Sequence, residues 1–120
     1  MARVLVVDDE PSMRFLLRVT FEIAGHEVTE APNGLAAIQA VESGRAPDLV
    51  ATDFMMPLMN GGELIARLRA NPATASMPVI LVSSSPGSET KTGADAFFRK
   101  PFDPDALVAC AAALPERRRR

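Results

Sequence analysis

Residues 4–14, VLVVDDEPSMR, pass from an apolar strand into the start of a helix and place two carboxylates at the junction. The β-branched run Val4–Val7 predicts a buried strand, which Asp8 and Asp9 follow directly. Pro11 suits the first turn of a helix, because a residue there needs no N–H donor, and the apolar residues after it recur at helical spacing. The stretch therefore predicts a strand, an acidic turn and a helix in succession.

The same alternation continues along the chain. Four further apolar runs predict strands at Glu27–Ala31, Leu49–Thr52, Val79–Val82 and Phe97–Phe98. Helical spacing of apolar residues predicts four helices. The first has Pro11 in its first turn and ends before Gly25, the second contains residues 36–41 and ends at Gly44, the third contains residues 64–68 and ends before Asn71, and the last covers roughly residues 104–114. Alternating strands and helices imply right-handed βαβ units. The predicted fold class is therefore α/β, with a doubly wound five-stranded parallel sheet covered on both faces.

The span between the fourth and fifth strands differs from the others. Its sequence SSSPGSETKTGADA, residues 83–96, holds a proline, two glycines and no apolar residue at helical spacing. We expect a loop with at most one turn, so a helix between these two strands should be short or missing. Few apolar residues mean little buried surface, so we expect Pro86–Thr92 to be mobile.

Composition limits the kind of protein. The 120 residues are 48% hydrophobic, which suits one domain, expected over residues 1–115, followed by a basic tail at 116–120. No apolar run reaches the roughly 18 residues of a membrane helix, and the acidic start argues against a signal peptide. The single cysteine, Cys110, has no disulfide partner in the chain. We therefore expect a cytoplasmic protein without membrane insertion.

The net charge is unevenly distributed. The formal charge is −2, and the four arginines of residues 117–120 leave −6 on the remainder. Phosphate contacts need clustered Lys and Arg, so we expect no nucleic acid to bind through the folded body.

Polar residues follow most of the predicted strands. In an open parallel sheet, ligands bind outside the carboxyl ends of the strands, and these ends carry Asp8, Asp9, Asp53, Ser83 and Lys100. Carboxylates about 4 Å apart repel by on the order of 4 kcal/mol per pair at an effective dielectric of about 20. A Mg²⁺ ion, which prefers hard oxygen ligands, offsets that repulsion. The set predicts a Mg²⁺ site.

A cation at this edge would allow phosphoryl chemistry. Asp53 can then act as the nucleophile that forms an acyl phosphate, with Lys100 and Mg²⁺ neutralising the transferring oxygens. The Ser83 hydroxyl can donate to a phosphoryl oxygen, so its direction would differ between the two states. These residues predict a phosphorylation switch.

The motifs VLVVDDEPSMR, DLVATDFMMPLMNG, PVILVSS and GADAFFRKPF, in this order and approximate spacing, resemble the receiver domains of response regulators, the CheY-like family. The resemblance covers nearly the whole chain. It implies a flavodoxin-like strand order 2-1-3-4-5. It also implies a single-domain two-component response regulator that takes a phosphoryl group from a histidine kinase or a histidine phosphotransfer protein. Such a protein signals by binding a downstream protein, and it is no enzyme beyond catalysing its own phosphorylation and dephosphorylation.

The resemblance also implies roles for individual residues. Asp9 and Asp53 would bind Mg²⁺ directly, Asp8 would bind it through water, and the backbone carbonyl of Met55 would be a further ligand. Among the remaining matches, Lys100 is the lysine that pairs with the phosphoryl group and precedes a proline whose peptide bond is commonly cis. Ser83 and Phe97 match the two switch positions, the conformational hydroxyl and the aromatic that changes rotamer.

Two alternatives come from other functional classes. One is a degenerate receiver that docks without phosphorylation, although the acidic set here has no gaps. The other is a phosphohydrolase with an aspartyl-phosphate intermediate, which would want a second carboxylate two residues after Asp53, where this chain has Met55. Incubation with a small phosphodonor and Mg²⁺ would discriminate between them.

Overall fold

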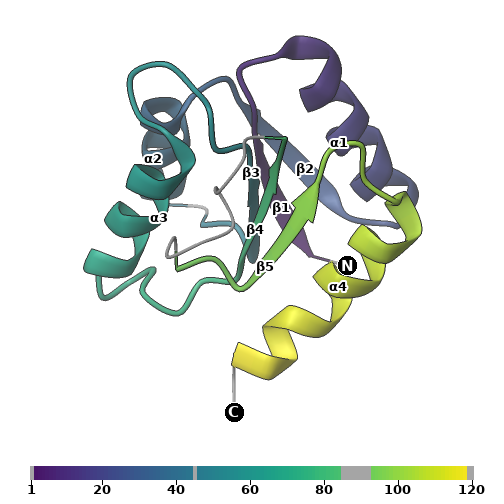
Figure 1. Ribbon diagram of the computed structural model, residues 1–120. Helices are drawn as coiled ribbons and strands as arrows, with labels where there is room; N and C mark the ends of the chain where they lie inside the picture. The colour runs from purple at the N-terminus through teal and green to yellow at the C-terminus, as the bar shows by residue number, and fades with distance from the viewer. Residues whose placement is uncertain (1, 45, 85–92, 119–120) are drawn as a thin grey trace.

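The computed structural model describes residues 2–44, 46–84 and 93–118. In chain order its elements are β1 (Arg3–Val7), α1 (Pro11–Ile23), β2 (Glu27–Ala31), α2 (Gly34–Glu42), β3 (Leu49–Thr52), α3 (Gly61–Ala70), β4 (Val79–Ser83), β5 (Ala96–Arg99) and α4 (Pro104–Arg118) (Figure 1). The alternation of strand and helix is as predicted.

All strand pairs in the sheet are parallel, and the strands lie in the order β2-β1-β3-β4-β5. This confirms the predicted fold class and the order that the family resemblance implied. The order makes β1 and β3 direct neighbours, with Val7 in register with Thr52. The residues that follow these two strands therefore emerge side by side at the carboxyl edge of the sheet.

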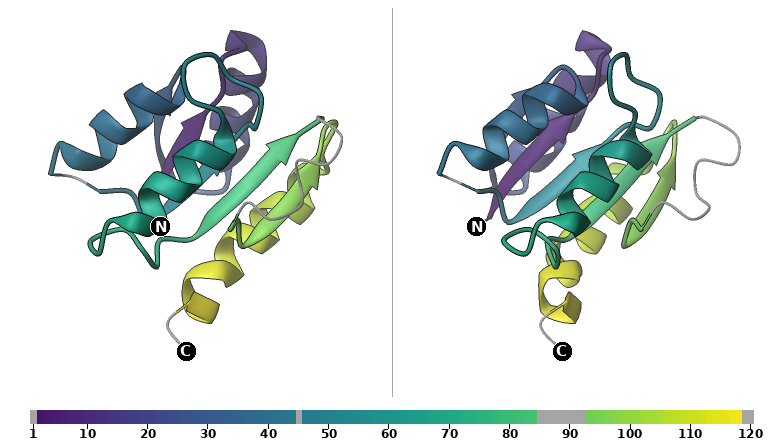
Figure 2. Two further views of the ribbon diagram at one scale, coloured as in Figure 1. Left: turned by 60° about the vertical axis from the view of Figure 1, so that its left-hand side comes forward. Right: turned by 90° about the vertical axis from the view of Figure 1, so that its left-hand side faces the viewer.

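Helices cover both faces of the sheet, α1 and α4 on one side and α2 and α3 on the other (Figures 1 and 2). Because successive strand residues point to opposite faces, Val4 and Val6 join the core cluster that contains Leu17 of α1 and Leu107 of α4. The intervening Leu5 joins the second cluster, beneath α2 and α3. Both faces of the central strands are thus dry, which explains their uninterrupted apolar sequence.

The starts of α1 and α3 are capped differently. Pro11 lies in the first turn of α1 as predicted, but Glu10 at the N-cap position makes no side-chain cap bond. The side chain of Asn60 accepts a hydrogen bond from the backbone N–H of Glu63, whose own side chain accepts from the backbone N–H of Asn60. This capping box fixes the start of α3, which lies close to the candidate site described below.

Some boundaries differ from the prediction. Strand β4 includes Ser83, and β5 starts at Ala96, one residue early. Helix α4 extends to Arg118 rather than ending at Leu114. Between β4 and β5 the described residues contain no helix, which fits the predicted short or missing fourth helix. The segment Pro86–Thr92, predicted to be mobile, lies outside the described residues. Among the residues described, no helix has the length and apolar character to cross a membrane.

Arg69 of α3 ties the starts of β4 and β5 together at the amino edge of the sheet. One terminal nitrogen donates to the Met77 carbonyl at 2.6 Å, and the other donates to the Asp95 carboxylate at 3.0 Å and the Gly93 carbonyl at 3.1 Å. The same carboxylate oxygen accepts from the backbone N–H of Val79 at 2.8 Å. Since β5 is an edge strand, these bonds hold its register at the end away from the site.

We expect Arg69→Ala to destabilise the fold by about 2 kcal/mol, because it removes the charge-assisted hydrogen bonds from Arg69 to the Asp95 carboxylate and to the carbonyls of Met77 and Gly93. Urea unfolding monitored by circular dichroism would measure the change. Arg67→Ala, on an exposed position of the same helix, is the matched control and should change stability by less than about 0.5 kcal/mol. Equal effects of the two substitutions would show that Arg69 has no special structural role.

Candidate functional site

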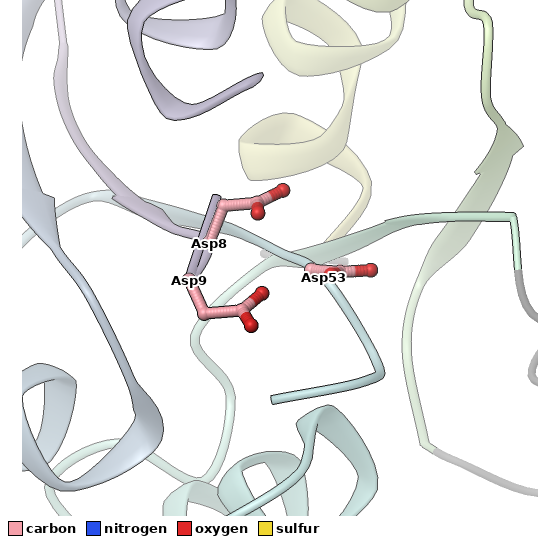
Figure 3. A group of neighbouring side chains, drawn as sticks. All are labelled: Asp8, Asp9 and Asp53. Carbon is pink, nitrogen blue, oxygen red and sulfur yellow. The ribbon is translucent and has the colours of Figure 1, made fainter. Parts of the chain in front are cut away.

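Three carboxylates meet at the carboxyl edge of the sheet. Asp8 and Asp9 follow β1 and Asp53 follows β3, and one carboxylate oxygen of each lies within 4.8 Å of the others (Figure 3). Backbone bonds hold these positions, since the Asp53 N–H donates to the Val7 carbonyl at 2.9 Å and the Asp8 N–H donates to the Ala31 carbonyl at 3.2 Å. The cluster therefore follows directly from the order of the strands.

Lys100, which follows the edge strand β5, brings a positive charge to this cluster. Its ammonium lies 2.9 Å from Oδ2 of Asp8 and 3.5 Å from Oδ1 of Asp53. The backbone N–H of Lys100 donates to the Ser83 carbonyl at 3.2 Å, which continues the β4–β5 pairing past the end of β5. The Lys100–Pro101 peptide bond is cis. Lys100 thus bridges carboxylates from two different strands.

Asp53 is a buried carboxylate with mixed surroundings. Burial, with a smaller contribution from the Asp8 charge, raises the pKa of Asp53 above the ordinary 3.8. The Lys100 ammonium acts in the opposite direction, as do hydrogen bonds from the Phe54 N–H and the Ser83 side chain. Since the net direction is upward, the anion of Asp53 is under-stabilised in the folded protein. A further cation beside it would favour the charged form.

Asp8 and Asp9 have opposite environments although they are neighbours in sequence. Asp8 is fully buried, and its two carboxylate oxygens accept from the Glu10 N–H at 2.9 Å and from Lys100. Asp9 is exposed, and within the described residues its carboxylate has no hydrogen-bond partner. Asp9 therefore keeps more oxygen lone pairs available to a cation than Asp8 does.

The loop from β3 to α3 packs closely against the backbone of Asp53. The N–H of Gly61, the first residue of α3, donates to the Phe54 carbonyl at 2.7 Å. A Cβ at Gly61 would collide with the backbone carbonyl of Asp53, so only glycine allows α3 to start this close to the site. Within the loop, the exposed Leu58 has a positive φ of 72°, in a tight turn closed by the Met59 N–H and the Pro57 carbonyl at 2.8 Å.

The remaining predicted residues take different positions. Ser83 is fully buried at the end of β4, next to Asp53. Phe97 of β5 is half-buried against the core beneath α2 and α3, with the Arg99 guanidinium 5.9 Å from its ring centroid. The Met55 side chain is 61% exposed. A ligand role for the Met55 carbonyl stays a prediction.

The donor set suits Mg²⁺. Carboxylate oxygens from two neighbouring strands converge within a few ångströms, and one of the three carboxylates is open to solvent. Mg²⁺ usually takes one or two carboxylates and keeps several waters, so an exposed ligand position is what it requires. Asp8, Asp9 and Asp53 could together hold such an ion.

A profile of the response regulator receiver domain family matches residues 4–112. The chain belongs to this family. Protein PilH of Pseudomonas aeruginosa is 34% identical over 113 residues, which cover 90% of this chain and 93% of PilH. A chemotaxis protein CheY homolog of Campylobacter jejuni is 34% identical over 111 residues, covering 88% of this chain and 85% of that protein. The receiver domain is thus similar in sequence to proteins of about its own length.

Longer relatives match through part of their length. PhoB of Pseudomonas aeruginosa, a phosphate regulon transcriptional regulatory protein, is 39% identical over 111 residues, which cover 88% of this chain and 48% of PhoB. The chain likewise covers 50% of the Synechocystis regulator RpaA. This receiver domain therefore spans about half the length of these two curated relatives.

Solved receiver structures share the fold over nearly the whole chain. The receiver domain of a histidine kinase from Syntrophus aciditrophicus superimposes with a TM-score of 0.89 at 28% identity, covering 97% of this chain and 91% of that one. Vibrio cholerae CheY4 gives 0.85 at 30% identity, covering 95% and 98%. These likenesses support the comparison of site residues by their place at the strand ends.

Two residues that support the site, Gly61 and Arg14, were not predicted from the sequence. Gly61 lies inside a quoted motif, and its contact with Asp53 depends on how closely α3 approaches β3. Arg14 of α1 donates to the backbone carbonyl of Asp8 at 2.8 Å and to Glu30 of β2 at 3.0 Å. A helical position near the acidic turn was the only signal that could have pointed to Arg14.

The raised pKa of Asp53 predicts a stability effect with a definite sign. The folded state binds the Asp53 proton more tightly than the unfolded state does, so the charged form weakens the fold increasingly as pH rises from about the ordinary 3.8 through the raised pKa. We expect Asp53→Asn to raise the melting temperature at pH 7 in chelator, and the gain to vanish as the pH is lowered below that window.

Thermal melts of both proteins between pH 3.5 and 8 would measure this difference. Glu42→Gln, at an exposed position at the end of α2, is the matched control and should show little gain at any pH. A lower melting temperature for Asp53→Asn at pH 7 would contradict the prediction.

Proposed function

We propose that this receiver domain accepts a phosphoryl group on Asp53 in a Mg²⁺-dependent reaction and signals by binding another protein. The observation that carries the proposal is the meeting of Asp53 with Asp8, Asp9 and Lys100 at one edge of the sheet. A buried carboxylate of raised pKa beside a lysine and two further acids has no evident structural purpose, and perturbed groups of this kind cluster at functional sites.

The donor would be a phosphohistidine of a histidine kinase or histidine phosphotransfer protein, consistent with a cytoplasmic location. In the reaction one oxygen of Asp53 attacks phosphorus, the bond from phosphorus to the imidazole nitrogen breaks, and the aspartyl phosphate forms. Mg²⁺ held by Asp9 and Asp53 would neutralise the phosphoryl oxygens. Lys100, already 3.5 Å from Asp53, would supply a second positive charge.

Ser83 and Phe97 are placed to transmit the change. The Ser83 hydroxyl donates a hydrogen bond to Asp53, and the same hydroxyl would donate to a phosphoryl oxygen of an aspartyl phosphate instead. The register pairs Leu81 with Phe97 and Ser83 with Arg99, so Ser83 and Phe97 face the same side of the sheet on neighbouring strands. A movement of Ser83 would therefore alter the space beside Phe97, which downstream proteins could detect.

Phosphorylation should depend on Asp53 alone. We expect incubation with acetyl phosphate and Mg²⁺ to add the mass of one phosphoryl group to the parent protein, as measured by intact mass spectrometry, and to add nothing to Asp53→Asn. Asp48→Asn, at an exposed position before β3, should label like the parent. Labelling of Asp53→Asn at the parent rate would rule out Asp53 as the nucleophile, whereas an unlabelled parent would favour the docking-module alternative.

Magnesium should stabilise the free domain. A cation that binds only the folded state adds RT ln(1 + [L]/Kd), or about 2.7 kcal/mol at a hundredfold excess over Kd. Melting temperatures in Mg²⁺ and in chelator would reveal the shift, and Asp9→Ala should remove most of it because Asp9 is the exposed ligand. The exposed Glu42→Ala should leave the shift intact. Identical melting temperatures for the parent under both conditions would count against the Mg²⁺ site.

A further inference from the structure

The guanidinium of Arg14 connects the acidic turn to the neighbouring strand β2. Its Nη1 donates to the backbone carbonyl of Asp8 at 2.8 Å, and its Nε donates to Oε1 of Glu30 at 3.0 Å. The Arg14 side chain is 20% exposed, so both bonds lie in a partly desolvated place. The planar Arg14 guanidinium thus holds the Asp8 carbonyl and the Glu30 carboxylate at a fixed separation.

The direction of the Asp8 carbonyl sets the orientation of the backbone that leads into Asp9. This carbonyl and the Asp9 N–H belong to one planar peptide unit, so fixing the direction of the carbonyl fixes that plane. On the other side of the turn, the Asp8 N–H is held by Ala31 and the Asp8 carboxylate holds the Glu10 N–H. Asp9 itself has no side-chain partner within the described residues. The backbone of the turn therefore decides where the Asp9 carboxylate points.

We propose that Arg14 is a positioning residue for the divalent cation: by holding the Asp8 carbonyl, its guanidinium keeps the Asp9 carboxylate facing Asp53. This inference rests on the Mg²⁺ binding proposed above. Residues that hydrogen-bond to the ligand shell from outside commonly change metal affinity by roughly 10-fold or more when they are removed. Arg14 touches no predicted ligand atom and acts through the peptide between Asp8 and Asp9.

Charge and geometry make opposite predictions for Arg14. A positive side chain beside a cation site repels the cation, so removing the charge alone should tighten Mg²⁺ binding. Losing the hydrogen bond from Arg14 to the Asp8 carbonyl should instead weaken Mg²⁺ binding. The direction of the change in Kd therefore separates a positioning role from a purely electrostatic one.

Arg18 supplies a matched control on the same helix. Its Nη1 donates to Oε2 of the same Glu30 at 3.0 Å and its Nε donates to Glu22 at 3.1 Å, so Arg18 shares the network of Arg14. Of these two arginines, Arg14 is the one that donates a hydrogen bond to the Asp8 carbonyl. The substitutions Arg14→Met and Arg18→Met each remove one positive charge from the α1–β2 network, and they differ at the Asp8 carbonyl.

The experiment titrates Mg²⁺ into the phosphate-free proteins by calorimetry. We expect Arg14→Met to raise Kd roughly 10-fold and Arg18→Met to leave it within about twofold of the parent. In two-dimensional NMR of the metal-free proteins, the Asp9 amide, which shares a peptide with the Asp8 carbonyl, should shift in Arg14→Met and stay in place in Arg18→Met. Arg14→Lys keeps the charge without the planar guanidinium and should also weaken binding, which covers the case that Arg14→Met does not fold.

Each contrary result has a distinct meaning. An unchanged or tighter Kd for Arg14→Met, equal losses for Arg14→Met and Arg18→Met, or parent affinity for Arg14→Lys would each overturn the positioning role. A parent protein that binds no Mg²⁺ would overturn the cation site itself, and that result is visible before any variant is compared.

Discussion

The bridge that Lys100 makes between Asp8 and Asp53 is the interaction on which the charge balance of the site depends. Three carboxylates share a small volume, and each pair at about 4 Å repels by on the order of 4 kcal/mol at an effective dielectric of about 20. The Lys100 ammonium offsets part of this repulsion, while burial raises the pKa of Asp53 and so still disfavours its charged form. The folded chain therefore holds an acidic site that a further cation would stabilise.

The fold determines which residues share this site. Parallel pairing of β1 with β3 places Asp8 and Asp53 side by side, whereas Lys100 follows an edge strand separated from β3 by β4. The long flexible stem of lysine covers that separation. Its reach still depends on the register of β5, which Arg69 and Asp95 hold at the opposite end of the sheet. Contacts at the amino edge thus help to set the chemistry at the carboxyl edge.

The sequence predicted the sheet and the members of the site because both depend on local signals. Apolar runs and the residues just after them located Asp8, Asp53 and Lys100 at strand ends. The Gly61 contact and the Arg14 bond to the Asp8 carbonyl depend on the approach and rotation of whole helices, which spacing alone does not determine. The sequence does not predict the extension of α4 by about one turn beyond Leu114, because its apolar spacing ends there and the basic residues after it are assigned to a tail, although arginine is a good helix former and suits a helix C-terminus.

The proposed phosphorylation of Asp53 would act on the same set of charges. Lys100 and Ser83 both interact with Asp53 in the described state, and Lys100 also pairs with Asp8. A phosphoryl group on Asp53 would offer stronger acceptors to both side chains than the present carboxylate does. A ligand shifts an equilibrium only by its difference in affinity for the two states. Redirecting Lys100 and Ser83 is such a difference, and Ser83 faces the same side of the sheet as Phe97, so the change would reach the half-buried surface of β5.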